Sequence, residues 1–362
     1  MSVTADKLRG IAPAVPAADD SRVRWIDTAR GFCILFVVLY HVNIGMLGAG
    51  LVAPDSVVQF VDYLLYSFTM GVFFLLSGLF ALQQMRSAKS FSRFVSRTAR
   101  TLLYPYLVWA TVQYAMVASA GSSANVPVQP SLLGYAALLW HPPAHFWFLY
   151  ALFVMHVWGY VVTRLPLRDP PLAGLLLSLG LYGLGEAYAL SYIGNEIARY
   201  GIFYFLGMLM SARRGEARPS PADGRSYARL LLPGTALLLA GWFVASLLAW
   251  QQGLPGARAV TLHLMLLGMF AVFGLSALLQ HYLPTISGLL ATLGRESLPI
   301  YLLHVMVVAG VRLIALQLLG SDALRAQPGA FMAVELALGV GLPLAFNAAM
   351  RSLKIAGALG LR

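Results

Sequence analysis

Charged residues are scarce in this chain. Asp, Glu, Lys and Arg together form 11% of the 362 residues, whereas a soluble domain carries roughly 25%. Hydrophobic residues form 59%, and they gather in blocks of about 20 residues, the length that a helix needs to cross a bilayer. A single soluble domain is therefore excluded, and we predict an all-α, polytopic membrane protein.

Cysteine is almost absent, because Cys33 is the only one in the sequence. One cysteine excludes an internal disulfide and a cysteine-based metal cluster. The histidines show neither the HExxH nor the HxH spacing of metal ligands, so we expect no metal site.

A cleavable signal peptide is missing as well. Residues 1–24 are rich in Ala, Pro, Asp and Arg and contain no apolar core of the kind that such a signal needs. We expect residues 1–24 to form a disordered cytoplasmic tail, residues 25–352 to form the membrane domain, and residues 353–362 to form a short cytoplasmic tail.

The apolar blocks predict about ten transmembrane helices. The stretch HPPAHFWFL (141–149) interrupts one block, so the part before it is expected to be a short interfacial or re-entrant piece. The ten blocks lie near residues 31–50, 60–84, 101–120, 132–163, 171–192, 197–212, 230–250, 260–280, 297–319 and 329–350.

Positive charge is distributed unevenly over the predicted loops. If the N-terminus is cytoplasmic, 21 of the 25 Lys and Arg residues fall on the inner side, and only Arg199, Arg258, Arg312 and Arg325 fall on the outer side. This bias is the positive-inside rule, and it predicts that both termini are cytoplasmic. The net charge of +11 therefore indicates topology, with anionic membrane lipids rather than nucleic acid as its partner.

The first apolar block, RWIDTARGFCILFVVLYH (24–41), carries polar groups that are costly in lipid. Arg30 and His41 are eleven residues apart, so they share a helix face and lie ~16 Å apart along the axis. A neutral imidazole can act as a general base, and Arg30 can hold a phosphate or an anionic intermediate. Asp27 lies near the same face and could orient Arg30. The structural alternatives are an interfacial anchor for Arg30 and a histidine satisfied by a neighbouring helix.

Two features follow in the second and third blocks. Ser77 and Gly78 in FFLLSGLFAL are expected to allow close helix packing. Arg93, Arg97 and Arg100 follow at i, i+4 and i+7, a spacing that places them on one helix face. Such a stripe binds either phosphates or anionic lipid headgroups.

Aromatic and histidine side chains mark two later stretches. His145, Trp147 and Tyr150 fit either an aromatic interface belt or a sugar site, which needs flat apolar faces with polar partners. In GRESLPIYLLHVM (294–306), Tyr301 and His304 lie on one side of the predicted helix, and His304 could face the first intramembrane histidine across a central cavity.

One buried charge pair is also expected. Arg312 and Glu335 lie deep in the last two apolar blocks. Opposite charges inside a membrane domain pair with one another, so we interpret these two residues as a structural pair.

These stretches together resemble the acyltransferase-3 membrane family, which transfers acyl groups, usually acetyl, to sugars of bacterial surface polysaccharides. The most specific part is Arg, ten residues and then His, here Arg30 and His41. FFLLSGLF with the basic stretch and LLYPYLVW, then HFWFLYALF, then GRESLPIYLLH follow in the family's order. The resemblance covers nearly the whole chain.

The resemblance implies an enzyme of the bacterial inner membrane with acetyl-CoA as its donor substrate and no permanently bound cofactor. His41 is then the essential base and Arg30 places the donor, with Asp27 and Ser77 in support. The three-arginine stripe becomes a site for the CoA phosphates, and the acceptor, a glycan or a lipid-linked sugar, meets His145, Trp147, Tyr150, Tyr301 and His304. Arg30 or His304 is expected to stabilise the oxyanion.

Two other classes of protein remain open at this point. Intramembrane His, Arg and Glu also suit a proton- or solute-coupled transporter, and a flippase for lipid-linked sugars needs no chemistry. The motifs do not name the acceptor sugar, the acyl group, the side of the membrane where transfer occurs, or the oligomeric state.

Overall fold

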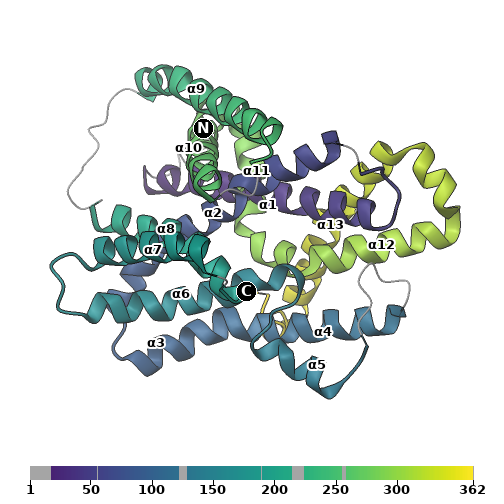
Figure 1. Ribbon diagram of the computed structural model, residues 1–362, viewed down its shortest axis with the longest axis horizontal. Helices are drawn as coiled ribbons and strands as arrows, with labels where there is room; N and C mark the ends of the chain where they lie inside the picture. The colour runs from purple at the N-terminus through teal and green to yellow at the C-terminus, as the bar shows by residue number, and fades with distance from the viewer. Residues whose placement is uncertain are drawn as a thin grey trace, which may run out of the picture.

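The helices of this protein account for all of its regular structure over the residues that the computed structural model describes, which are 18–54, 56–121, 129–188, 190–213, 224–254 and 258–361. The predicted all-α class is confirmed for this part of the chain (Figure 1). The α-helices are α1 (Ala18–Gly48), α2 (Ser56–Ser87), α3 (Phe91–Thr98), α4 (Tyr104–Ala120), α5 (Leu132–Ala136), α6 (Trp147–Arg164), α7 (Pro170–Ala187), α8 (Tyr192–Arg213), α9 (Gly224–Gln251), α10 (Arg258–Tyr282), α11 (Pro284–Arg295), α12 (Ser297–Ala326) and α13 (Pro328–Ser352).

Each of the ten apolar blocks contains helix, but fewer than ten helices among the described residues are long and apolar enough to span a membrane. Within the described residues, 7 segments meet that description, so the number predicted from the sequence is too high. Three helices fall short for physical reasons. α4 has 17 residues, the apolar part of α7 is short, and α8 carries Asn195, Glu196 and Arg199 in its first turns.

The interruption predicted within residues 132–163 is confirmed. α5 ends at Ala136, and a 3-10 turn, Ala137–Leu139, follows it. A second 3-10 turn, Ala144–Phe146, leads into α6. The consecutive prolines Pro142 and Pro143 explain the break, because proline supplies no N–H and the residue before it disfavours the helical conformation.

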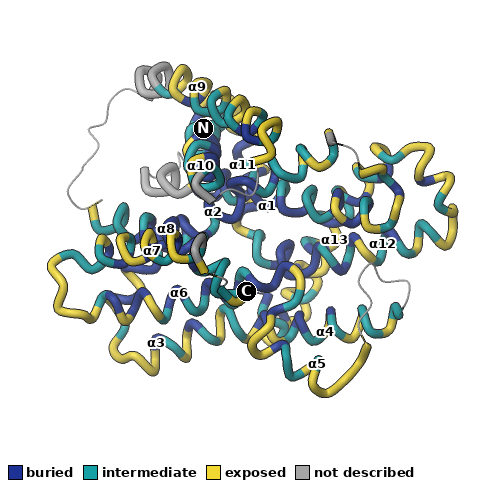
Figure 2. The backbone as a smooth tube through the Cα atoms, in the orientation of Figure 1, coloured by how far each residue is buried: buried dark blue, intermediate teal, exposed yellow. Residues whose placement is uncertain are grey.

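α1 occupies the centre of the fold, where it packs against α2, α10, α11, α12 and α13. Figure 2 shows buried residues gathered along α1 and α2, while α3, α5 and α9 carry many exposed residues. A central helix surrounded by others can bury polar side chains that lipid would reject. This placement explains how the polar groups of the first block are accommodated.

Glycines allow two close helix contacts. A Cβ at Gly31 of α1 would lie 1.9 Å from the Leu290 carbonyl oxygen of α11, so only glycine fits there. A Cβ at Gly78 of α2 would lie 1.9 Å from the Tyr204 carbonyl oxygen of α8. The close packing predicted at Ser77–Gly78 is therefore confirmed, with α8 as the partner.

The two predicted tails lie partly within the described residues. Residues 1–17 lie outside the described residues, but the last part of the predicted N-terminal tail belongs to α1, which begins at Ala18. At the other end, the Trp109 indole donates a 2.9 Å hydrogen bond to the Leu359 carbonyl oxygen, and Leu361 is fully buried. The C-terminal segment thus packs against α4.

Candidate active site

His41 and His304 form a contacting pair. His41 projects from the last third of α1, and His304 projects from the first third of α12. The His304 Nε2 atom lies 3.2 Å from the His41 Nδ1 atom, a hydrogen-bonding distance. The expectation that these two imidazoles approach one another is thus met by direct contact rather than across a cavity.

Backbone carbonyl oxygens hold both rings in place. The His41 Nδ1 atom lies 2.8 Å from the Val37 carbonyl oxygen. The His304 Nδ1 atom lies 3.0 Å from the Ile300 oxygen and 2.9 Å from the Tyr301 oxygen. His304 is fully buried, whereas His41 reaches a cavity. Together with the contact between the two rings, these three contacts to carbonyl oxygens restrict rotation of both imidazoles.

His145 adds a third imidazole to the cluster. Its ring centroid lies 5.7 Å from that of His41 and 5.0 Å from that of His304. Both of its ring nitrogens are buried, and neither has a hydrogen-bond partner among the described residues. The Tyr301 hydroxyl donates to the His145 backbone oxygen, which ties the turn before α6 to α12.

The backbone before His145 is strained. Ala144 has φ of 45°, in the left-handed region that a residue with a Cβ rarely adopts. Such strain persists only where the surroundings enforce it, and it often accompanies functional sites. Here it aims the imidazole of the next residue toward α1 and α12.

A cavity of about 650 Å³ begins at His41. α1 and α12 run in the same direction beside it, because His41 meets His304 and, further along, the Arg325 Nε atom donates to the Gly50 oxygen at 2.9 Å. The floor near His41 is polar and aromatic, and the walls toward the Gly48 end of α1 are apolar. The floor includes Tyr40, His41, Tyr66, His145, Tyr192 and Tyr301, and the walls include Ile44, Met116, Val117, Ala120, Leu313 and Leu316.

The residues predicted for an acceptor pocket divide into three groups. His145, Trp147 and Tyr301 line the cavity. His304 lies behind the floor, in contact with His41. Tyr150 is not among the lining residues, and its ring packs 5.9 Å from that of Tyr106.

Arg312 and Glu335 pair as predicted, with 2.8 Å between Nη2 and Oε2, and their side chains are 6% and 0% exposed. The Arg312 Nη2 atom also donates to the Val42 carbonyl oxygen. A Cβ at Gly45 would lie 2.0 Å from Nη1 of Arg312, so the guanidinium occupies the space that glycine leaves one turn beyond His41. Arg312 also lines the cavity. The sequence had indicated only a structural role for it.

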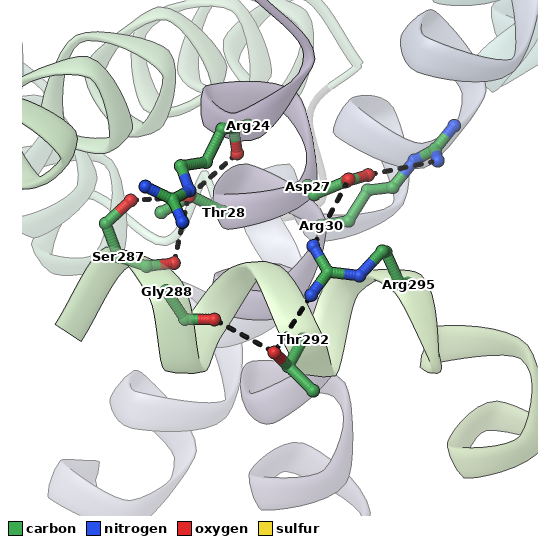
Figure 3. A network of polar contacts seen from close by, with 8 residues as sticks. All are labelled: Arg24, Asp27, Thr28, Arg30, Ser287, Gly288, Thr292 and Arg295. Carbon is green, nitrogen blue, oxygen red and sulfur yellow. Dashed lines mark hydrogen bonds and ion pairs between the residues drawn. The ribbon is translucent and has the colours of Figure 1, made fainter. Parts of the chain in front are cut away.

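A separate polar cluster lies at the other end of α1 (Figure 3). Asp27 stands between two arginines, 3.7 Å from Nη1 of Arg30 and 3.9 Å from Nη1 of Arg295. The Arg30 guanidinium lies 5.4 Å from the Phe80 ring centroid, and Thr292 accepts a hydrogen bond from Arg295. Arg30 is not among the residues that line the cavity.

Arg295 and the tyrosines of the floor were missed by sequence reasoning. Arg295 follows Gly294 in a motif that was noted, but its contact with Asp27 depends on how α11 docks on α1. Tyr66 and Tyr192 carry no local signal, because each looks like an ordinary aromatic residue of an apolar helix. Tyr40 adjoins His41, and this position in the sequence is the only local sign that it belongs to the site.

The three-arginine stripe lies apart from the cavity. Arg93, Arg97 and Arg100 are all exposed, while Phe94 and Thr98 of the same segment are buried. Arg100 belongs to a π-helical turn, Ala99–Leu103, so the regular α-helical spacing ends before it. Ser77 donates to the Phe73 carbonyl oxygen at 2.7 Å, within its own helix.

Within the part of the chain that the structure describes, no group of three or more His, Cys, Asp or Glu residues is arranged to hold a metal ion. The cavity offers the imidazole nitrogens of its histidines, the buried guanidinium of Arg312 and the hydroxyl groups of its tyrosines. These groups can accept a proton, bind a polyhydroxylated ligand and stabilise a developing negative charge.

Comparison with known proteins agrees with this chemistry. No curated protein and no solved structure is significantly similar to the chain. The acyltransferase-3 family profile, described as an acyltransferase domain, matches residues 23–346, which include all but the first five residues of α1 and the whole histidine cluster. Because this match covers nearly all of the sequence, the chain belongs to the acyltransferase-3 family.

Proposed function

We propose that this protein transfers an acetyl group from acetyl-CoA to a hydroxyl of a glycan or a lipid-linked sugar in the bacterial inner membrane, with His41 as the general base. The observation that carries the proposal is the position of His41 at the polar floor of a cavity with apolar walls. Family membership makes the protein an acyltransferase, which favours this reaction over a transporter or a flippase.

The donor is proposed to bind at the Arg30 end of α1, which we assign to the cytoplasmic side. The Arg30 and Arg295 side chains are 29% and 56% exposed, and the two arginines share one carboxylate, so the cluster carries net positive charge. Arginines bind phosphates through charge-assisted hydrogen bonds. The axial distance of ~16 Å from Arg30 to His41 fits an extended pantetheine arm. The exposed Arg93, Arg97 and Arg100 are a further proposed contact for the CoA phosphates.

The acceptor is proposed to enter the cavity from the opposite direction. A sugar fits the floor, where aromatic rings and hydroxyl groups surround His41. The apolar walls beyond it fit a lipid chain. This gradient from polar to apolar favours a lipid-linked sugar over a free oligosaccharide. Arg312 lies between the two regions, at the level of Gly45.

The reaction follows from these positions. As the acceptor oxygen attacks the thioester carbonyl, His41 removes the hydroxyl proton. Buried N–H groups stabilise the tetrahedral oxyanion. The candidate donor is the ring of His145, whose nitrogens have no hydrogen-bond partner among the described residues. When the C–S bond breaks, His41 returns the proton to the CoA sulfur. The products are an ester and free CoA.

The proposal is tested with purified protein in detergent, radiolabelled acetyl-CoA and polyprenyl-linked sugar acceptors. Wild-type protein should produce labelled acceptor, and His41→Ala should reduce the rate by about 10²–10⁴-fold, the range for losing a general base. His281→Ala is the matched control, because His281 is exposed at the end of α10. Wild-type protein that binds acetyl-CoA but transfers no acetyl group to any sugar acceptor would contradict the proposed reaction.

A further inference from the structure

We infer that His304 is a positioning residue that fixes the protonation pattern of His41, the role that a carboxylate plays beside the histidine of hydrolase triads. The inference rests on the proposed function only in taking His41 as the base. The contact between His304 Nε2 and His41 Nδ1 carries it.

The first step assigns the proton on His304. Its Nδ1 atom lies within 3.0 Å of two carbonyl oxygens, those of Ile300 and Tyr301. Carbonyl oxygens only accept hydrogen bonds, so Nδ1 must carry the hydrogen. In a neutral imidazole the other nitrogen then holds a lone pair. The Nε2 atom of His304 is therefore an acceptor.

The second step assigns the proton on His41. Its Nδ1 atom faces the Val37 carbonyl oxygen at 2.8 Å and the Nε2 atom of His304 at 3.2 Å. Both of these neighbours are acceptors, so His41 Nδ1 carries the hydrogen and donates to them. The lone pair of His41 is left on Nε2, where it can take a proton from the acceptor hydroxyl.

The third step excludes other arrangements. A proton on His304 Nε2 would face the N–H of His41 and repel it. His304 therefore stays neutral, and a proton added to the pair goes to Nε2 of His41. The expectation that His304 donates a hydrogen bond to the oxyanion is replaced, because its Nε2 atom has no hydrogen to donate.

The energetic role of His304 appears when His41 becomes positively charged. The hydrogen bond from His41 Nδ1 to His304 Nε2 then has a charged donor, which makes it stronger. The bond thus stabilises the transition state more than the ground state. A carboxylate would do the same, but an ionised carboxylate in the membrane interior is expensive. A neutral imidazole avoids that desolvation.

Two substitutions separate positioning from packing. His304→Phe keeps a flat ring but removes the acceptor, and His304→Gln offers an amide oxygen near the position of Nε2. We expect His304→Phe to lower kcat for acetyl transfer by about 10²-fold with KM for acetyl-CoA unchanged. His304→Gln should recover most of this loss. Both variants are compared with wild-type protein for monodispersity and thermal unfolding.

Either of two kinetic results would overturn the inference. One is a wild-type kcat for His304→Phe. The other is an equal loss of kcat in folded His304→Phe and folded His304→Gln, since the acceptor atom would then be irrelevant.

An NMR measurement that does not depend on enzyme activity tests the hydrogen bond between His41 and His304 separately from the proposed function. In protein labelled with ¹⁵N-histidine, the N–H···N bond should give a scalar coupling between His41 Nδ1 and His304 Nε2, which disappears in His304→Gln. His41→Gln identifies the signals. If His41 instead carries its hydrogen on Nε2, the inference is wrong even in an active enzyme. If the coupling is present but wild-type protein transfers no acetyl group, the proposed function fails instead.

Discussion

The two ends of α1 present charge in opposite ways. At the Arg30 end, two partly exposed arginines share Asp27 at 3.7 and 3.9 Å. Toward the Gly48 end, Arg312 meets Glu335 at 2.8 Å, and both side chains are buried. Exposed ion pairs are weak and easily exchanged, whereas a buried pair is fixed because separating it is costly. The first arrangement suits a charged ligand that binds and leaves, and the second suits a fixed wall of a site.

The largest expected effect comes from breaking the buried pair. Glu335→Ala leaves the Arg312 guanidinium buried without its counter-ion, so we expect unfolding free energy to fall by about 3–5 kcal/mol. The measurement is denaturant-induced unfolding in detergent. The control is the double variant Arg312→Met with Glu335→Leu, which removes both charges and should recover most of the stability. A single variant as stable as the wild type would show that the pair contributes nothing.

A smaller effect is expected at the Arg30 end of α1, where the quantity that changes is KM for acetyl-CoA rather than the free energy of unfolding. Arg30→Ala removes one cation from the proposed donor site but leaves the helix intact. We expect KM for acetyl-CoA to rise about 10-fold, equivalent to ~1.4 kcal/mol, with unfolding free energy nearly unchanged. Initial rates at varied acetyl-CoA provide the test, and Lys354→Ala serves as an exposed control. An unchanged KM would remove Arg30 from the donor site.

The smallest effect is expected for Arg295, the more exposed of the two arginines at 56%. Arg295→Ala should raise KM for acetyl-CoA by only about 3-fold, since an exposed charge is strongly screened. Raising the salt concentration in wild-type protein should weaken donor binding in the same direction while leaving the stability due to the buried pair unaltered. Salt-independent donor binding would mean that these arginines do not hold the CoA phosphates.

Several features could be read from local sequence because each depends on one segment. The apolar blocks predict the helices, because a run of about twenty apolar residues is the length that a helix needs to cross the hydrocarbon core of a bilayer. The spacing of Arg30 and His41 gives their axial separation. The Ser77–Gly78 step indicates a close crossing, though not that α8 is the partner. The pairing of Arg312 with Glu335 follows from the absence of other charges at their depth.

Other features needed the packed structure. The number of helices that can span a membrane was overpredicted, because apolar character in α7 and α8 extends less far than the blocks implied. The role of Arg295 was missed, because α11 lies along α1 only when Gly31 lets the two backbones touch. The sequence placed Arg93, Arg97 and Arg100 on one face of a regular helix, but the structure puts Arg100 in a π-helical turn, Ala99–Leu103.

What the sequence by itself determined is the class of protein, its helices and the residues able to do chemistry, because hydropathy and helical spacing act along one segment. What only the tertiary structure decided is how those residues face one another. The rotation of α12 about its axis turns His304 toward His41, and the break at Ala144 brings His145 to both. The proposed base nitrogen of His41 is then set by two contacts of Nδ1, one to Val37 within α1 and one to His304 of α12. Only the second of these contacts depends on how the helices pack.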